Sequence, residues 1–132
     1  MWFAMAMVLY PQTLKRAQAE IDELLGREGS AMPTFIHMEH LPYCFALVKE
    51  VLRWMPAAPG GFPHYTDHDD EYKGYKIKAK TMVIPNIWAM QRNEEEFPNA
   101  DEFLPERFFT QELDLTQTSL TDSHYGFGFG RR

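Results

Sequence analysis

The residues best suited to chemistry lie in the last stretch of the sequence, Tyr125-Gly126-Phe127-Gly128-Phe129-Gly130-Arg131-Arg132. Glycines at alternate positions allow backbone conformations that are closed to other residues. The aromatic rings between them favour contact with a flat or apolar group, and the two arginines supply planar donors that suit carboxylate or phosphate oxygens. The stretch therefore predicts a loop that wraps closely around a ligand. The alternatives are a segment that binds single-stranded nucleic acid and a tail of no function.

Two histidine pairs are candidates for a metal site, because His37 with His40 and His64 with His68 have spacings that could bind a metal from a helix. The second pair, however, lies among aspartates in a stretch that opens with a proline, where a solvated loop is the ordinary explanation. A four-ligand set cannot be assembled from these residues. We therefore predict that no metal is bound by protein side chains alone.

Composition excludes several classes of protein. The 132 residues have the length of one domain, and a hydrophobic content of 45% is enough to build a core. Nineteen acidic residues against 13 basic ones argue against a nucleic-acid surface. Cys44 is the single cysteine, so an intramolecular disulfide and a cysteine-based zinc site are both excluded.

Helices are predicted in the first half of the chain. The apolar run from Trp2 to Tyr10 is too short to span a membrane and is typical of the end of a buried helix. Pro11 suits the first turn of a second helix, whose apolar residues recur at helical spacing until Gly26 stops it. A short turn of helix is expected at residues 34–40.

A further helix is predicted between Pro42 and Pro56, with one apolar stripe formed by Cys44, Leu47, Val48, Val51, Leu52 and Met55. Cys44 is therefore expected to be a buried structural thiol. Glu50 and Arg53 lie three positions apart on the opposite side, where amphipathicity alone favours a solvated pair.

Strands are predicted in the second half. Residues 72–77 and 81–85 are expected to form a hairpin around residues 78–80, and residues 87–90 a helical turn. From residue 93 onward, prolines and acidic residues alternate with phenylalanines, which is typical of an irregular segment pinned by large apolar side chains.

Taken in order, these motifs resemble the C-terminal half of the cytochrome P450 family, the haem-thiolate monooxygenases, and fungal microsomal members in particular. The motifs that carry the resemblance are Glu50-Val51-Leu52-Arg53, Pro63-His64, the predicted hairpin, Phe103-Leu104-Pro105-Glu106-Arg107-Phe108 and Phe127-Gly128-Phe129-Gly130-Arg131-Arg132. The implied fold is mainly α with a small antiparallel β-sheet, a partial cytochrome P450 fold. Its expected parts are a helical region (1–56), a loop and hairpin (57–92), and an irregular segment with the haem-binding loop (93–132).

The resemblance also implies roles for single residues. Glu50 and Arg53 match a helix pair that Arg107 joins in a buried ionic network, which contradicts the solvated-pair interpretation. The residues that match haem-contacting positions are His64 and Arg132 at the propionates, Phe127 packed under the haem, and Gly128 and Gly130 in the ligand loop.

The iron ligand in the family is a cysteine that would follow Arg132 by two positions. We therefore expect this chain to be a fragment of a monooxygenase of the EC 1.14 class, without catalytic residues of its own and inactive alone. The alternative is a non-catalytic truncated product or an interaction module that retains the helical core.

For the full-length parent, the resemblance implies haem as cofactor, an apolar small-molecule substrate, an NADPH-dependent reductase as electron donor, and attachment to the endoplasmic reticulum membrane.

Overall fold

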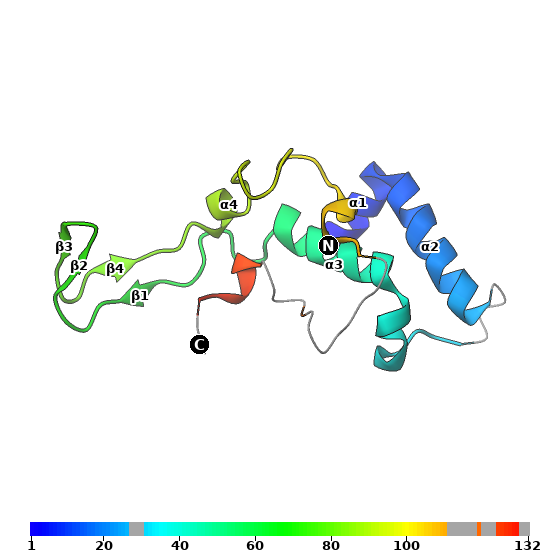
Figure 1. Ribbon diagram of the computed structural model, residues 1–132, viewed down its shortest axis with the longest axis horizontal. Coiled ribbons are helices and arrows are strands. Elements are labelled where there is room, and N and C mark those ends of the chain that lie inside the picture. Colours follow the sequence, from blue (N-terminus) through cyan, green and yellow to red (C-terminus); the bar gives the residue numbers. More distant parts are fainter. Residues whose placement is uncertain (27–30, 111–118, 120–123, 130–132) are drawn as a thin grey trace.

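A computed structural model of the chain describes residues 1–26, 31–110, 119 and 124–129. Its elements are α1 (Trp2–Leu9), α2 (Pro11–Leu25), the 3-10 helix η1 (Phe35–His40), α3 (Pro42–Trp54), β1 (His64–Tyr65), β2 (Asp70–Tyr72), β3 (Tyr75–Ile77), β4 (Met82–Val83), α4 (Ile87–Met90), and the 3-10 helices η2 (Pro105–Phe108) and η3 (Tyr125–Phe127). The longer helices pack together at one end, and the strands extend from them as a narrow arm (Figure 1). The fold is mainly helical with small antiparallel sheets, which confirms the predicted class.

Helix α2 begins and ends where the sequence predicts. Pro11 occupies its first position, where a missing N–H leaves no hydrogen bond unmade. Gly26 ends it with a φ of 83°, in the left-handed region that glycine favours. The apolar run before Pro11 is helical as well, with Ala6 and Met7 buried. Within the described residues, every helix is too short or too polar to cross a membrane.

Helix α3 receives its N-terminal cap from another helix. The residues at its own N-terminus provide no side-chain cap, and Pro42 at its first position has no N–H. Glu20 of α2 instead accepts hydrogen bonds from the backbone N–H groups of Tyr43 (2.7 Å) and Cys44 (2.8 Å). A carboxylate in this place satisfies two free donors and interacts favourably with the positive end of the helix dipole. The cap therefore ties α2 to α3.

Aromatic side chains join α3 to the irregular segment that follows α4. The ring of Trp54 contacts Tyr10 and Phe103, with centroids 6.0 and 5.4 Å apart. The indole N–H of Trp54 donates to the carbonyl of Asp101 at 3.0 Å, which satisfies its one polar atom. The core cluster consists of Ala6, Met7, Ala17, Tyr43, Leu47, Trp54 and Phe103.

The predicted apolar stripe of α3 faces this core for most of its length. Leu47 is buried, and Cys44, Val51 and Met55 pack against the cluster as partly buried side chains. Val48 departs from the pattern, since 41% of it is exposed and it lines a groove beside η1.

The predicted hairpin is wrong in its pairing. Residues 72–77 do not form one strand, because β2 and β3 pair with each other and place Tyr72 opposite Tyr75. The chain reverses at Lys73 and Gly74, whose φ angles are 50° and 83°. Two successive positive φ angles give the turn that matches the twist of a two-stranded hairpin. Strand β4, which was expected to pair with residues 72–77, pairs with β1.

The cap from Glu20 leads to a stability prediction. Replacing Glu20 with alanine removes both acceptors at the start of α3, so we expect the free energy of unfolding to fall by about 1–2 kcal/mol. Urea titration followed by circular dichroism measures the change. Glu23→Ala is the matched control, because this exposed glutamate lies one turn further along the same helix. Equal losses for the two variants would show that the cap contributes nothing.

Candidate functional site

The centre of the site is an ion pair within α3. Glu50 and Arg53 are both fully buried, with 0% of each exposed. The Nε and Nη2 atoms of Arg53 donate to the two carboxylate oxygens of Glu50 at 2.8 and 2.9 Å, which makes a bidentate pair. The solvated-pair interpretation is wrong because η2 and its flanking residues cover this face of α3.

Arg107 of η2 approaches the same carboxylate. Its Nε atom lies 3.2 Å from each oxygen of Glu50, and the backbone N–H of Leu104 donates to Oε1 at 2.8 Å. The Glu50 carboxylate is thus surrounded by two cations and a backbone donor. The three residues expected to form an ionic network lie in contact.

The two arginines also hold the irregular chain between α4 and η2. Their remaining N–H groups donate to backbone carbonyls at 2.8–3.1 Å: those of Gln91 and Glu102 for Arg53, and those of Pro98 and Asn99 for Arg107. A segment without regular secondary structure thereby finds hydrogen-bond donors for four of its backbone carbonyls. Since one carboxylate cannot neutralise two guanidinium groups, these carbonyl dipoles compensate the remaining charge.

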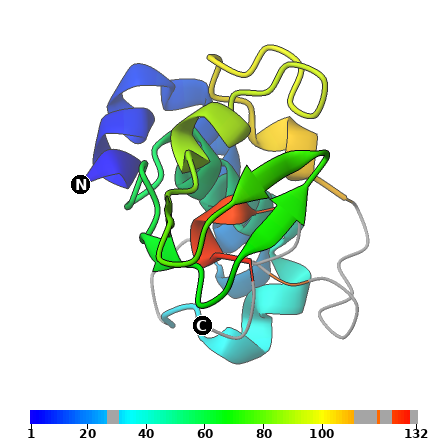
Figure 2. The ribbon, with the colours of Figure 1, turned by 90° about the vertical axis from the view of Figure 1, so that its left-hand side faces the viewer.

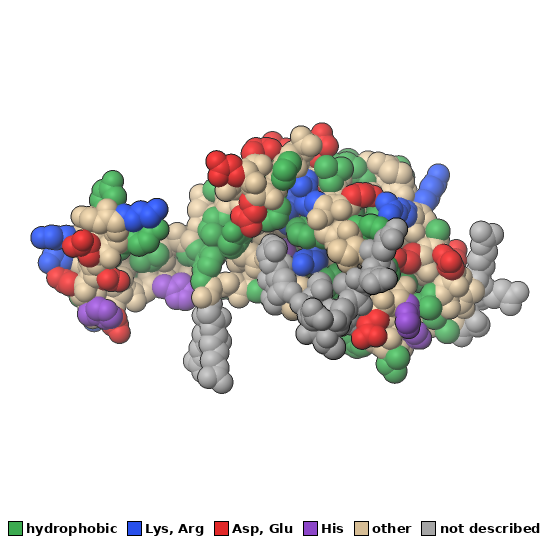
Figure 3. Space-filling view, viewed as in Figure 1, with side chains coloured by type: hydrophobic (Ala, Val, Ile, Leu, Met, Phe, Trp, Pro, Cys, Tyr) green, Lys and Arg blue, Asp and Glu red, His purple; other side chains and the backbone are tan. Residues whose placement is uncertain are grey.

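A shallow groove of about 190 Å³ lies where η3 meets the base of the strand arm. Its lining is mostly apolar and comes from distant segments: Ala58, Gly61, Phe62, His64, Pro85, Ile87 and residues 125–129. Figure 2 looks along the arm with the strands in front of η3, and Figure 3 shows hydrophobic side chains gathered beside the arm. The rings of Phe62 and Phe127 are 75% and 52% exposed, so they present apolar faces to a ligand.

Two glycines shape the walls of this groove. Gly61 has a φ of 60°, and a Cβ atom there would lie 2.4 Å from Cγ of Pro85, so a side chain cannot be accommodated without movement. Gly128 has a φ of 89°, a conformation that L side chains rarely adopt. Both positions therefore require glycine for the observed backbone.

The structure brings three of the predicted haem-contacting residues together. His64, Phe127 and Gly128 all line the groove. Gly130 and Arg132 lie outside the described residues.

Sequence analysis missed two buried polar side chains behind the groove. His124 is 6% exposed and Gln91 is 0% exposed, and the Nε2 atom of Gln91 lies 3.3 Å from Nδ1 of His124. Burial lowers the pKa of His124, and the nearby cations Lys49 and Arg53 lower it further. The neighbouring Tyr125 donates its hydroxyl to Glu96 at 2.7 Å. The sequence signal, a polar residue directly before the aromatic-glycine run, is weak.

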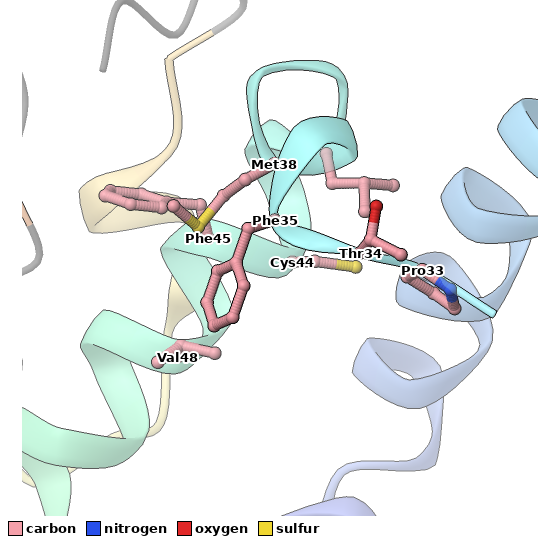
Figure 4. Close-up of a pocket in the computed structure, with 8 residues that line it drawn as sticks. Pro33, Thr34, Phe35, Met38, Cys44, Phe45 and Val48 are labelled. Atoms are coloured by element: carbon pink, nitrogen blue, oxygen red, sulfur yellow. The ribbon is translucent and has the colours of Figure 1, made fainter. Parts of the chain in front are cut away.

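Cys44 lies in a different environment. It borders a second, apolar groove of about 290 Å³ between η1 and α3, together with Phe35, Met38 and Val48 (Figure 4). Burial raises the pKa of its thiol to about 12, and the Glu20 carboxylate contributes to the same shift. The single cysteine of the sequence is therefore a protonated thiol at neutral pH, and it is not among the residues that line the groove at η3.

Comparison with known proteins identifies the family. The family profile described as Cytochrome P450 matches residues 1–132. This chain belongs to the cytochrome P450 family. It is 52% identical to cytochrome P450 monooxygenase 58 of Postia placenta, over 98% of the chain and 25% of that relative. It is 44% identical to a cytochrome P450 monooxygenase of Armillaria gallica, over 99% of the chain and 26% of that relative.

A solved structure shares the fold as well as the sequence. The chain superposes on a zebra fish cytochrome P450, described as a structure with progesterone, with a TM-score of 0.82 and 30% identity. The match covers 98% of this chain and 28% of the zebra fish chain. The chain thus spans about a quarter of the length of the relatives it matches.

The groove at η3 fits part of a haem, the cofactor that the cytochrome P450 family implies. Aromatic faces from Phe62 and Phe127 suit a flat apolar macrocycle, and the imidazole of His64 stands among them as a donor for an acidic edge. The positive φ angles at Gly61 and Gly128 keep the walls free of side chains that would fill the space. The aromatic rings and His64 therefore fit one face and one edge of a haem. Cys44 lies on the other groove and is not positioned to bind the haem iron.

The ionic network can be tested by removing Arg107. Arg107→Ala removes one of the two guanidinium groups that contact the Glu50 carboxylate and leaves the carbonyls of residues 98 and 99 without their donor, so we expect a loss of about 3–5 kcal/mol in the free energy of unfolding. The control is Arg16→Ala, which removes an exposed ion pair with Glu106 and a cation–π contact with Tyr43, and is expected to cost about 1 kcal/mol. Urea unfolding of both variants measures the two losses in stability. A loss for Arg107→Ala as small as that of the control would contradict a structural role for the network.

The environment of Cys44 predicts low reactivity. A pKa of about 12 leaves so little thiolate at pH 8 that we expect alkylation by iodoacetamide on the order of 1,000 times more slowly than for a free thiol. Removing the neighbouring charge in Glu20→Gln should lower the thiol pKa and raise the rate. A wild-type rate equal to that of glutathione would show that Cys44 is not held in this way.

Proposed function

We propose that these 132 residues form the part of a haem-dependent monooxygenase that holds one face and edge of the haem. The observation that carries the proposal is the groove in which His64, Phe127 and Gly128 meet. Gln91 links the histidine before η3 to Arg53 of the ionic network. Membership of the cytochrome P450 family supports it.

Each residue has a role that follows from its chemistry. The ring of Phe127 packs against the macrocycle, and Gly128 keeps the approach of the backbone close. His64 would donate to a propionate at the rim of the groove. The resemblance of the motif assigns Arg132 to a propionate and Gly130 to the ligand loop, and both lie outside the described residues. Haem with a thiolate ligand supplies the activation of molecular oxygen for insertion of one atom into substrate.

The substrate and the electron donor follow from the same proposal. The exposed ring of Phe62 beside Gly61 presents apolar surface next to the haem face, which suits an apolar small molecule. Electrons come from an NADPH-dependent reductase, and the longer protein is attached to the endoplasmic reticulum membrane, as for the fungal microsomal proteins that the motifs resemble.

The polypeptide of 132 residues does not by itself perform the reaction. Its single cysteine is Cys44, which is held protonated at the cap of α3 and lies on the groove beside η1. The thiolate ligand must therefore come from sequence outside these 132 residues, and the proposed activity is that of the longer protein.

Carbon monoxide binding tests this proposal. Reconstituted with haem and reduced under carbon monoxide, the 132-residue polypeptide should lack the Soret band at the wavelength for which the family is named. The longer protein, extended to its next cysteine, should show the band, and Cys44→Ser in that protein should leave it unchanged. A band from the 132-residue polypeptide that disappears in Cys44→Ser would overturn the proposal, as would a longer protein that binds no haem.

A further inference from the structure

Behind the groove at η3, one ring nitrogen of a buried histidine lies within hydrogen-bond distance of two other nitrogen atoms. Nδ1 of His124 lies 3.2 Å from the backbone nitrogen of Gly126 and 3.3 Å from Nε2 of Gln91. Its ring also packs edge-on against Phe127, with centroids 5.4 Å apart. The histidine therefore contacts the turn 125–127 through both its acceptor and its ring.

The backbone donor decides which tautomer is present. A backbone N–H can only donate, so the Nδ1 atom of His124 must carry a lone pair and the ring proton must lie on Nε2. The amide of Gln91 then presents its NH₂ group to the same lone-pair side. Burial and the cations of Lys49 and Arg53 keep the pKa of His124 low, which maintains the neutral ring that this arrangement needs.

Gln91 connects this contact to the ionic network. Its backbone carbonyl accepts from Nη1 of Arg53 at 2.8 Å, while its side chain reaches His124. Gln91, at the end of α4, is therefore hydrogen-bonded to Arg53 of α3 through its backbone and contacts His124 through its side chain.

Steric contact makes the turn sensitive to the position of the ring. A Cβ atom on Gly126 would lie 3.0 Å from both Cε1 and Nδ1 of His124. The ring thus lies directly against the backbone that leads into Phe127 and Gly128.

We propose that Gln91 and His124 are positioning residues. They fix the turn 125–127 relative to the Glu50–Arg53–Arg107 network, and that turn places the Phe127 ring and the Gly128 backbone. This inference rests on the proposed function. Neither residue is among those that line the groove, so they act through the turn. The acceptor at Nδ1, more than the volume of the ring, carries the effect.

The test compares two substitutions at position 124 in the longer holoprotein. His124→Phe keeps an aromatic ring and removes the acceptor, whereas His124→Asn loses the ring and keeps a side-chain oxygen that accepts from the N–H two residues on. We expect His124→Phe to release haem to apomyoglobin about tenfold faster than wild type, because the buried amide of Gln91 and the backbone N–H of Gly126 both lose their partner. His124→Asn should stay within about threefold.

Gln91→Leu is the independent variant, because it leaves the histidine in place. It should speed haem release a few-fold, and combining it with His124→Phe should add little, since both variants remove the same contact. His68→Phe, at an exposed histidine of the strand arm whose side chain is 78% accessible, is the matched control and should release haem at the wild-type rate.

The outcomes separate this inference from the proposed function. A wild-type protein that binds no haem overturns the proposed function. If wild type holds haem and His124→Phe releases it at the wild-type rate, the inference fails while the function stands. Faster release from His124→Asn than from His124→Phe would also overturn it, because packing of the ring would then be the cause. If His124→Phe does not fold, an unchanged rate for Gln91→Leu decides against the pair.

Discussion

The structure depends on one buried carboxylate. Glu50 is inaccessible to solvent, so its charge must be compensated inside the protein or be lost at a cost of several kcal/mol. It receives a bidentate guanidinium from its own helix, a second guanidinium from η2 and a backbone N–H from Leu104. Because these donors come from segments more than 50 residues apart, the charge is satisfied only when the irregular chain lies in one place on α3. The network therefore specifies a conformation more than it adds stability.

This constraint explains how a segment with little regular structure keeps a defined shape. Between α4 and η2 the described chain forms no strand, and several of its carbonyls accept hydrogen bonds from the two arginines. The Glu94 carboxylate adds a second tie by accepting from the backbone N–H groups of Asn99 and Ala100 at 2.9 and 3.0 Å. Phe103 fills the space against Trp54. In this segment, charged side chains and aromatic rings thus fix the backbone conformation, as backbone pairing does in a sheet.

Local rules predicted the helices well and the strand pairing poorly. Proline at a first helical turn and glycine at an end are decided by the residues themselves, so α2 could be placed from Pro11 and Gly26 alone. Pairing depends on where the chain turns, and the positive φ at Lys73, a residue that rarely adopts it, gave no sequence signal beyond the adjacent Gly74. The burial of Glu50 could not be derived from periodicity, which favours a solvated pair; it required comparison of the order of motifs with a known family.

The same reasoning explains why the polar residues behind the groove escaped notice. From the sequence, His124 is expected to be an exposed loop residue, because its neighbours in the sequence do not indicate that it packs near α3 and α4. Its position becomes apparent only in the folded structure. Arg53 binds the carbonyl of Gln91, the Gln91 side chain lies beside Nδ1 of His124, and the backbone N–H of Gly126 donates to the same nitrogen. If Nδ1 of His124 were protonated, it could not accept the hydrogen bond from the backbone N–H of Gly126. The buried cations that hold the irregular segment thus also disfavour charge on the histidine, so one electrostatic arrangement supports both the network and the loop.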